Sequence, residues 1–167
     1  RQMCIRDSGK INQIKDCDVV DLKNKGHSLK KIKELLPQIG HIQHVEMNRL
    51  NWGRFQTKIS TLHSLAPHDV SIIHYLLGYH EFERIMCIGE NFTNNKQNDR
   101  EEYFFTCDNV AVKLNLSWYY PEKVRTMSIT GENGLIFWDE ELKKIKLTTQ
   151  IWQSDRMNYK PVVEEFN

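Results

Sequence analysis

The chain has 167 residues, which is enough for one domain with a proper hydrophobic core. Its 23 Lys plus Arg and 22 Asp plus Glu nearly balance, and this excludes nucleic-acid or membrane-surface binding through bulk positive charge. The sequence has no apolar run long enough to span a membrane and no secretory signal, so we expect a cytoplasmic protein.

The N-terminal segment, residues 1–27, has little pattern, and we treat it as poorly defined or artefactual. Residues 28–167 are expected to form the domain. Within them, Ser28–Leu36 has the apolar spacing of a helix that Ser28 caps and that Pro37 and Gly40 end.

Alternating residues over His41–Trp52 predict a strand, and a helix over Leu62–Gly78 follows a polar loop. Pro67 suits the first turn of that helix, where a missing N–H costs nothing. His68 would then lie at the positive end of the helix, where a histidine tends to stay neutral near pH 7 and suits proton transfer. Ser64 lies four residues earlier, on the same helical face. On these residues alone, a capping or packing role for His68 stays open.

After Gly78 the pattern is that of short strands joined by tight turns. Asp108-Asn109 is a typical two-residue hairpin turn. The expected strands are Glu83–Gly89, Glu101–Cys107, Val110–Tyr119 ending before Pro121, Lys123–Thr130, Leu135–Trp138 and Leu142–Thr148, and the tail 151–167 is expected to cross the sheet. The fold class is therefore α+β, with an open, mostly antiparallel β-sheet and helices on one face.

Several common sites have no signature in this chain. No two of the eight glycines are spaced G-x-G, so the chain has no dinucleotide fingerprint of its own. The histidine spacings match no common zinc motif, and no metal site is expected. The four cysteines (Cys4, Cys17, Cys87 and Cys107) form no C-x-x-C unit and indicate buried thiols in a reducing compartment.

Four ordered stretches carry a family resemblance: Asn48–Phe55 (NRLNWGRF), Leu65–Ile72 (LAPHDVSI), Ser117–Arg125 (SWYYPEKVR) and Gly131–Gly134 (GENG). From about Ser28 to its end, the chain resembles the C-terminal domain of the glucose–fructose oxidoreductase/inositol dehydrogenase (Gfo/Idh/MocA) family. It is most similar to the branch that acts on nucleotide-linked sugars such as UDP-N-acetylglucosamine. The resemblance implies that an N-terminal Rossmann domain, absent here, binds NAD or NADP.

The resemblance also assigns roles. His68 matches the family histidine that accepts a proton from the sugar hydroxyl being oxidised, while the cofactor takes a hydride. Many members have an aspartate four residues before it, where this chain has Ser64, so an Asp–His dyad is in doubt. Arg49, Asn51 and Arg54 are candidates to bind the substrate, because arginine pairs with a diphosphate or carboxylate; surface or inter-subunit pairing is the alternative. Lys123 and Arg125 match a recurrent Lys-x-Arg with a structural or interface role.

The sequence thus predicts the substrate-binding half of an NAD(P)-dependent sugar or nucleotide-sugar dehydrogenase. We expect no nucleic-acid or membrane partner, and a homo-oligomer that forms through the sheet. This half alone is expected to be inactive. A non-catalytic sugar-binding or oligomerisation module is the alternative, which Ser64 and the missing cofactor half favour.

Overall fold

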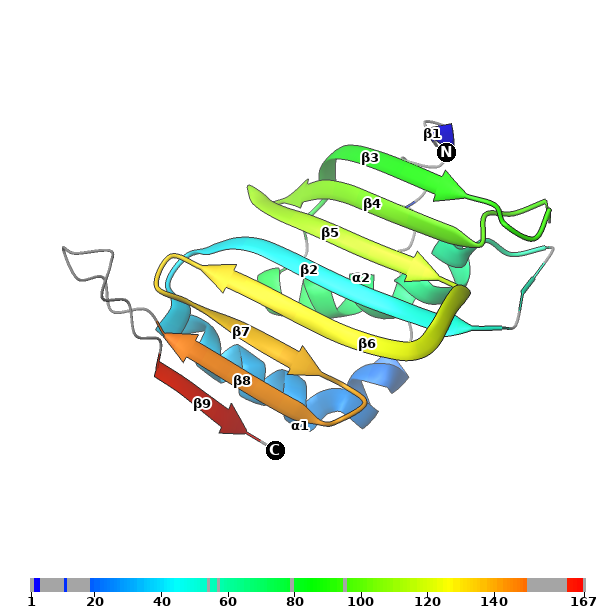
Figure 1. Cartoon of the computed structure of the whole chain (residues 1–167). Coiled ribbons are helices and arrows are strands. Elements are labelled where there is room, and N and C mark those ends of the chain that lie inside the picture. Colours follow the sequence, from blue (N-terminus) through cyan, green and yellow to red (C-terminus); the bar gives the residue numbers. More distant parts are fainter. Residues whose placement is uncertain are drawn as a thin grey trace, which may run out of the picture.

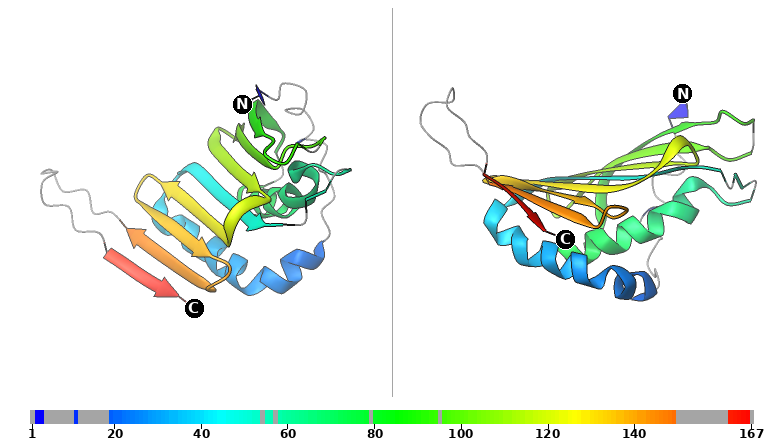
Figure 2. Two further views of the ribbon diagram at one scale, coloured as in Figure 1. Left: turned by 45° about the vertical axis from the view of Figure 1, so that its right-hand side comes forward. Right: turned by 60° about the horizontal axis from the view of Figure 1, so that its bottom comes forward.

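A nine-stranded sheet with both helices on one face makes up the described part of the chain, so that the molecule has two layers (Figures 1 and 2). The computed structural model describes residues 2–3, 11, 19–53, 55–56, 58–78, 80–94, 96–149 and 162–166. The helical elements are α1 (Val19–Leu35), the short 3-10 helix η2 (Leu36–Ile39) and α2 (Thr61–Leu77). Neither α1 nor α2 is both long enough and apolar enough to cross a membrane.

The strands follow one another along the sheet in the order β1-β3-β4-β5-β2-β6-β7-β8-β9. Their bounds are β1 (Gln2–Met3), β2 (Ile42–Trp52), β3 (Phe82–Glu90), β4 (Arg100–Cys107), β5 (Val110–Ser117), β6 (Tyr119–Gly131), β7 (Gly134–Asp139), β8 (Lys144–Thr149) and β9 (Val162–Phe166). Among the described strands only β2 and β5 pair in parallel; every other pair is antiparallel. The predicted α+β class is confirmed.

Local sequence explains most of the strands. Asp108 and Asn109 both have positive φ, 49° and 63°, as the predicted hairpin turn between β4 and β5 requires. Buried and partly exposed residues alternate along β4 and β5, because one face packs on α2 while the other is open. The predicted strand over His41–Trp52 is confirmed as β2, which lies at the centre of the sheet.

Both helices start earlier than the sequence predicts. Helix α1 begins at Val19, so Ser28 lies inside it and is not its cap. Helix α2 begins at Thr61, with Ser60 as the N-cap, and Pro67 is inside it. The predicted position of His68 at the positive end of the helix is therefore wrong, because the helix dipole acts only within about the first turn. The predicted end at Gly78 is confirmed, with φ of 91° and its N–H bonded to the His74 carbonyl.

Two further predictions need correction. Pro121 does not separate two strands but lies within β6, where residues 120–123 have no partner in the described registers and a missing N–H breaks no ladder bond. The tail does not cross the sheet over its described residues, because Val162–Phe166 runs along the edge and pairs with β8. Residues 150–161, Arg54, Cys4 and Cys17 lie outside the described residues.

Candidate active site

His68 lies midway along α2, on a stripe of half-buried residues beside the packed face of the helix. Ser64, His68, Ser71 and Tyr75 are three or four residues apart, so that they line one side of α2, and all four are half-buried. The neighbouring residues Leu65, Ala66, Asp69 and Ile72 are buried against the rest of the domain. The predicted pairing of Ser64 and His68 on one helical face therefore holds, although neither is near the helix start.

The N-terminus of α2 is fixed by a carboxylate from the sheet. Glu101 on β4 is 1% exposed, and its Oε2 accepts the Leu62 N–H at 2.9 Å and the Thr61 hydroxyl. Its other oxygen accepts a hydrogen bond from the Asn98 side chain at 3.2 Å. Because the first N–H groups of a helix have no partner within it, this buried carboxylate completes the helix start.

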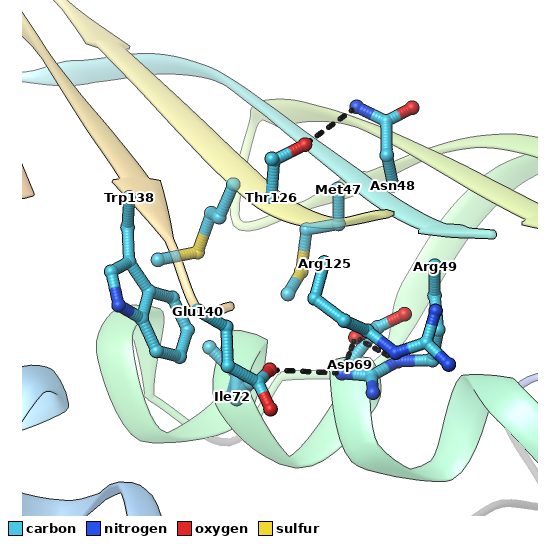
Figure 3. A pocket seen from close by; sticks show the side chains of 10 residues that line it. Met47, Asn48, Arg49, Asp69, Ile72, Arg125, Thr126, Trp138 and Glu140 are labelled. Atoms are coloured by element: carbon cyan, nitrogen blue, oxygen red, sulfur yellow. Dashed lines mark hydrogen bonds and ion pairs between the residues drawn. The ribbon is translucent and has the colours of Figure 1, made fainter. Parts of the chain in front are cut away.

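Arg49 and Asp69 form a buried ion pair between the centre of the sheet and α2 (Figure 3). Arg49 Nε and Nη2 donate to the same oxygen, Asp69 Oδ1, at 2.8 Å and 2.6 Å. Arg49 is 6% exposed and Asp69 is 1% exposed. The pair joins β2 to the residue that directly follows His68.

Further polar groups extend this pair toward the end of β2. Arg125 lies opposite Arg49 in the β2–β6 register and donates to the Leu50 carbonyl and to Asn51 Oδ1, at 2.8 Å and 2.9 Å. Burial, and then the nearby charge of Arg49, lower the pKa of Arg125 from its ordinary value. Glu140 Oε2 lies 3.9 Å from Arg49 Nη2, which supplies a second negative charge. Asn51 is thus held by Arg125, beside the Arg49–Asp69 pair.

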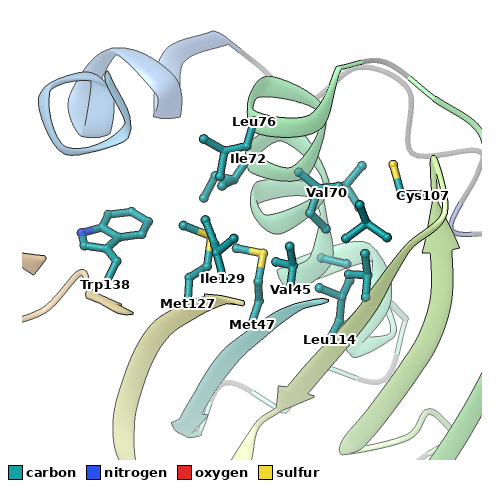
Figure 4. Close-up of a cluster of buried hydrophobic side chains, with 14 of the residues drawn as sticks. Val45, Met47, Val70, Ile72, Leu76, Cys107, Leu114, Met127, Ile129 and Trp138 are labelled. Atoms are coloured by element: carbon teal, nitrogen blue, oxygen red, sulfur yellow. The ribbon is translucent and has the colours of Figure 1, made fainter. Parts of the chain in front are cut away.

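The network borders a small cavity of about 10 Å³, the space of a single water molecule. Apolar side chains from β2, β6, β7 and α2 surround it on the sheet side of the helix (Figure 4). These include Met47, Met127, Trp138 and Ile72. The cavity is too small for a sugar, so the network supports a site and does not itself form one.

The structure brings some of the predicted site residues together. Arg49 and Asn51 bond to neighbouring partners, Asp69 and Arg125, and Ser64 and His68 share one helical stripe. The predicted structural role of Arg125 agrees with its bonds to β2. Sequence reasoning assigned no partner to Asp69. The signal was present, because Val45, Met47 and Arg49 alternate, a spacing that places the Arg49 side chain on the buried face of β2.

The described residues of this chain do not form the Rossmann-type turn that holds a nicotinamide dinucleotide. A dinucleotide's phosphates are usually held by a glycine-rich turn between a parallel strand and a helix. This chain has no G-x-G, and its parallel pair β2–β5 is joined through α2 and the antiparallel strands β3 and β4. Among the described residues no group of three or more His, Cys, Asp or Glu is placed to hold a metal ion.

Comparison with solved structures shows what the fold is. The chain superposes on an inositol dehydrogenase homologue from Azotobacter vinelandii, complexed with NADH and myo-inositol, with a TM-score of 0.70 and 13% identity, over 85% of this chain and 40% of that one. It superposes on UDP-N-acetylglucosamine 3-dehydrogenase from Acidithiobacillus ferrooxidans with a TM-score of 0.69 and 15% identity, over 86% of this chain and 45% of that one. Levoglucosan dehydrogenase in complex with NADH and L-sorbose superposes with a TM-score of 0.63 and 18% identity, over 81% of this chain and 43% of that one.

This chain has the fold of one part of Gfo/Idh/MocA-type dehydrogenases. It spans less than half the length of those three structures. The superposition confirms the predicted architecture, which is that of the C-terminal domain of these dehydrogenases. No protein-family model and no curated protein matches the sequence.

Proposed function

We propose that this chain is the substrate-binding half of an NAD(P)-dependent dehydrogenase of the Gfo/Idh/MocA family, acting on a hydroxyl group of a sugar or nucleotide-sugar. The observation that carries the proposal is the placement of His68. It lies half-buried on a helix that two buried carboxylates, Glu101 and Asp69, fix to the sheet of a dehydrogenase fold. A general base needs such a fixed and accessible position.

In this proposal His68 accepts the proton of the hydroxyl group being oxidised and returns it in the reverse reaction. Acid–base help of this kind contributes about 10²–10⁴-fold to the rate. Ser64, Asn51 and Arg54 contact the substrate, Ser64 by a hydrogen bond to a sugar hydroxyl. Arg49 is 6% exposed and bonded to Asp69, so a direct substrate contact would require it to leave that carboxylate.

The nicotinamide cofactor, NAD or NADP, supplies the hydride acceptor when it is bound, and sequence outside this chain would hold it. Residues 28–167 are the proposed substrate-binding and oligomerisation domain. The proposed location is the cytoplasm, where the buried thiols of Cys87 and Cys107 stay reduced.

We also propose that the protein is a homo-oligomer that associates through the open face of the sheet. One row of side chains crosses this face, as the strand registers show: Met86, Phe104, Lys113, Glu46, Ser128 and Phe137. Met86 and Phe137, at the two ends of this row, are 45% and 37% exposed, and each offers apolar surface that a second copy of the chain would cover. In the middle of the row, Lys113 Nζ donates a hydrogen bond to Glu46 Oε1 at 3.1 Å.

The test uses the full-length protein that contains this chain. Reduced nicotinamide is measured with NAD⁺ or NADP⁺ and with UDP-N-acetylglucosamine, myo-inositol or levoglucosan as the probe. We expect turnover with a sugar probe and a loss of about 10²–10⁴-fold in kcat for His68→Ala, with dinucleotide affinity unchanged. Unchanged kcat in His68→Ala, or a coding sequence without a Gly-rich βαβ unit, would contradict the proposal.

A non-catalytic sugar-binding or oligomerisation module is the second candidate, and Ser64 favours it because a serine supplies no negative charge beside His68. Size measurement and titration with UDP-N-acetylglucosamine distinguish the two candidates. Stable oligomers that bind the sugar nucleotide but transfer no hydride, with the upstream domain present, would support the module.

A further inference from the structure

The helical turn that carries His68 is held to the sheet by the most directional contact in the network. Asp69 directly follows His68, and two donors of one guanidinium, Arg49 Nε and Nη2, bond to its Oδ1 at 2.8 Å and 2.6 Å. Two bonds from a planar group fix the direction of approach as well as the distance. A shift or rotation of this turn would therefore break a buried, charged contact.

Backbone bonding within α2 leaves this turn weaker than its neighbours. Pro67 lies inside the helix and has no N–H to donate to the His63 carbonyl, and a proline ring also pushes against the preceding turn. The hydroxyl of Ser71 donates to the Pro67 carbonyl at 2.7 Å, which adds a side-chain bond on the far side of His68. The orientation of His68 thus depends more on contacts with the sheet than it would in an uninterrupted helix.

Arg49 itself has little freedom to move. The charge of Glu140 lies 3.9 Å from its Nη2, Arg125 lies opposite it on β6, and apolar residues enclose the rest. The adjoining cavity of about 10 Å³ leaves room for no more than a water molecule. Asp69 Oδ2, which lines this region, has no hydrogen-bond partner among the described residues, so Oδ1 alone carries the contact to the sheet.

We infer that Arg49 and Asp69 are positioning residues for His68: their ion pair fixes the turn of α2 from which the imidazole reaches the substrate. This inference rests on the proposed function of His68. Neither residue needs to touch the substrate in this role. A displacement of about 1 Å at a reacting group can lower a rate by about 10²-fold, so that loss of the pair should appear in kcat.

The decisive variant is the double substitution Arg49→Met/Asp69→Leu in the full-length protein. Apolar residues of similar volume often replace a buried ion pair without loss of stability. If the pair is merely structural, the double variant should retain both Tm and kcat. If the pair positions His68, the double variant should retain Tm while its kcat falls by about 10–100-fold, and its KM for UDP-N-acetylglucosamine should change far less. Full kcat in this variant overturns the inference.

Arg49→Lys covers the case in which the double variant does not fold. Lysine keeps the positive charge but cannot form both bonds to Oδ1, so we expect a smaller loss of kcat with Tm nearly unchanged. Wild-type kcat in Arg49→Lys overturns the inference. The matched control is the exposed ion pair Lys123–Glu141, 2.8 Å apart, whose replacement by Lys123→Met/Glu141→Leu should leave kcat unchanged.

A readout independent of turnover is the imidazole Hε1–Cε1 NMR signal of His68, assigned by its loss in His68→Gln. We expect this signal to move in Arg49→Met/Asp69→Leu and to stay in place in the control pair. An unmoved signal contradicts the inference. If His68→Ala retains full turnover, the proposed function fails; if His68→Ala is inactive and the double variant is fully active, only the positioning role fails.

Discussion

Glu101 and Leu62 connect the edge half of the sheet to the start of the helix that carries His68. The Leu62 N–H donates to Glu101 Oε2 at 2.9 Å, and the acceptor is 1% exposed. The two residues lie 39 positions apart in the chain, so the strand β4 determines where α2 begins. Ser60, the local cap, accepts the His63 N–H at a longer distance of 3.5 Å, and its hydroxyl also lies 3.0 Å from His63 Nδ1.

Replacing Glu101 should therefore destabilise the domain. Glu101→Ala leaves the Leu62 N–H and the Thr61 hydroxyl buried without an acceptor, and we expect a loss of about 2–4 kcal/mol in the free energy of unfolding, measured by urea titration. Glu101→Gln should lose less. The control is Glu102→Gln, whose half-exposed partner is Arg100 and whose effect should stay below about 1 kcal/mol. Equal effects for Glu101→Ala and Glu102→Gln would contradict this assignment.

Two glycines should respond in opposite directions to alanine. A Cβ on Gly131 would lie 2.3 Å from the Ile39 carbonyl oxygen, a backbone atom, so Gly131→Ala should destabilise by about 1–3 kcal/mol. Gly26 lies inside α1 with nothing within 4 Å of such a Cβ, so Gly26→Ala should stabilise by about 0.5–1 kcal/mol. Thermal unfolding of both variants tests the pair, and a stabilised Gly131→Ala would refute the close approach.

His74 should make the stability of the domain depend on pH. Its ring stacks on Phe82 with 5.0 Å between centroids, and burial lowers its pKa below the ordinary 6.5. The unfolded chain therefore binds the proton first, so this contribution to stability is complete above about pH 6.5 and is lost as the pH falls toward the lower folded pKa. Urea titrations at pH 7.5 and 5.5 should show a smaller pH effect in His74→Gln than in wild type. The control His27→Gln, at an exposed position, should show the same dependence of stability on pH as the wild type. A dependence as large as that of the wild type in His74→Gln would contradict this prediction.

Cys107 should be unreactive in the native protein. Burial, with a smaller contribution from Asp108, raises its pKa to about 11, so at pH 8 roughly one thiol in a thousand is ionised. Iodoacetamide should label Cys107 only after unfolding, as peptide mass spectrometry would show. An introduced cysteine at exposed Ala111 on β5, Ala111→Cys, should be labelled in the native state. Equal labelling of both positions would show that Cys107 is accessible.

The open face of the sheet should control association. Phe137→Asp replaces an exposed apolar side chain by a charge, opposite Ser128 and Lys146 on this face, and we expect it to lower the oligomer fraction measured by light scattering. Leu142→Asp makes the same kind of change in the β7–β8 turn, where Leu142 is 67% exposed, and should leave association unchanged. A monomeric wild-type protein would contradict association through the sheet.

Much of the architecture could be predicted because it depends on neighbouring residues. The alternation over His41–Trp52 identified β2, and Asp108-Asn109 identified a hairpin turn, since both signals act within a few residues. The sequence resemblance also pointed to the fold that comparison with solved structures confirms. The C-terminal end of α2 could also be predicted from the sequence, because Gly78 adopts the positive φ that follows many helices.

The sequence by itself therefore determined the fold class, the central strand, most hairpins and the helix that bears Ser64 and His68. Only the tertiary structure decided where α2 starts and what Arg49 does. The start of α2 depends on Glu101, which lies 39 positions from its partner Leu62. The role of Arg49 depends on Asp69, which lies 20 positions away in the chain. Buried charges take the partner that folding brings within bonding distance, because an unpaired charge in the core is far more costly than one at the surface.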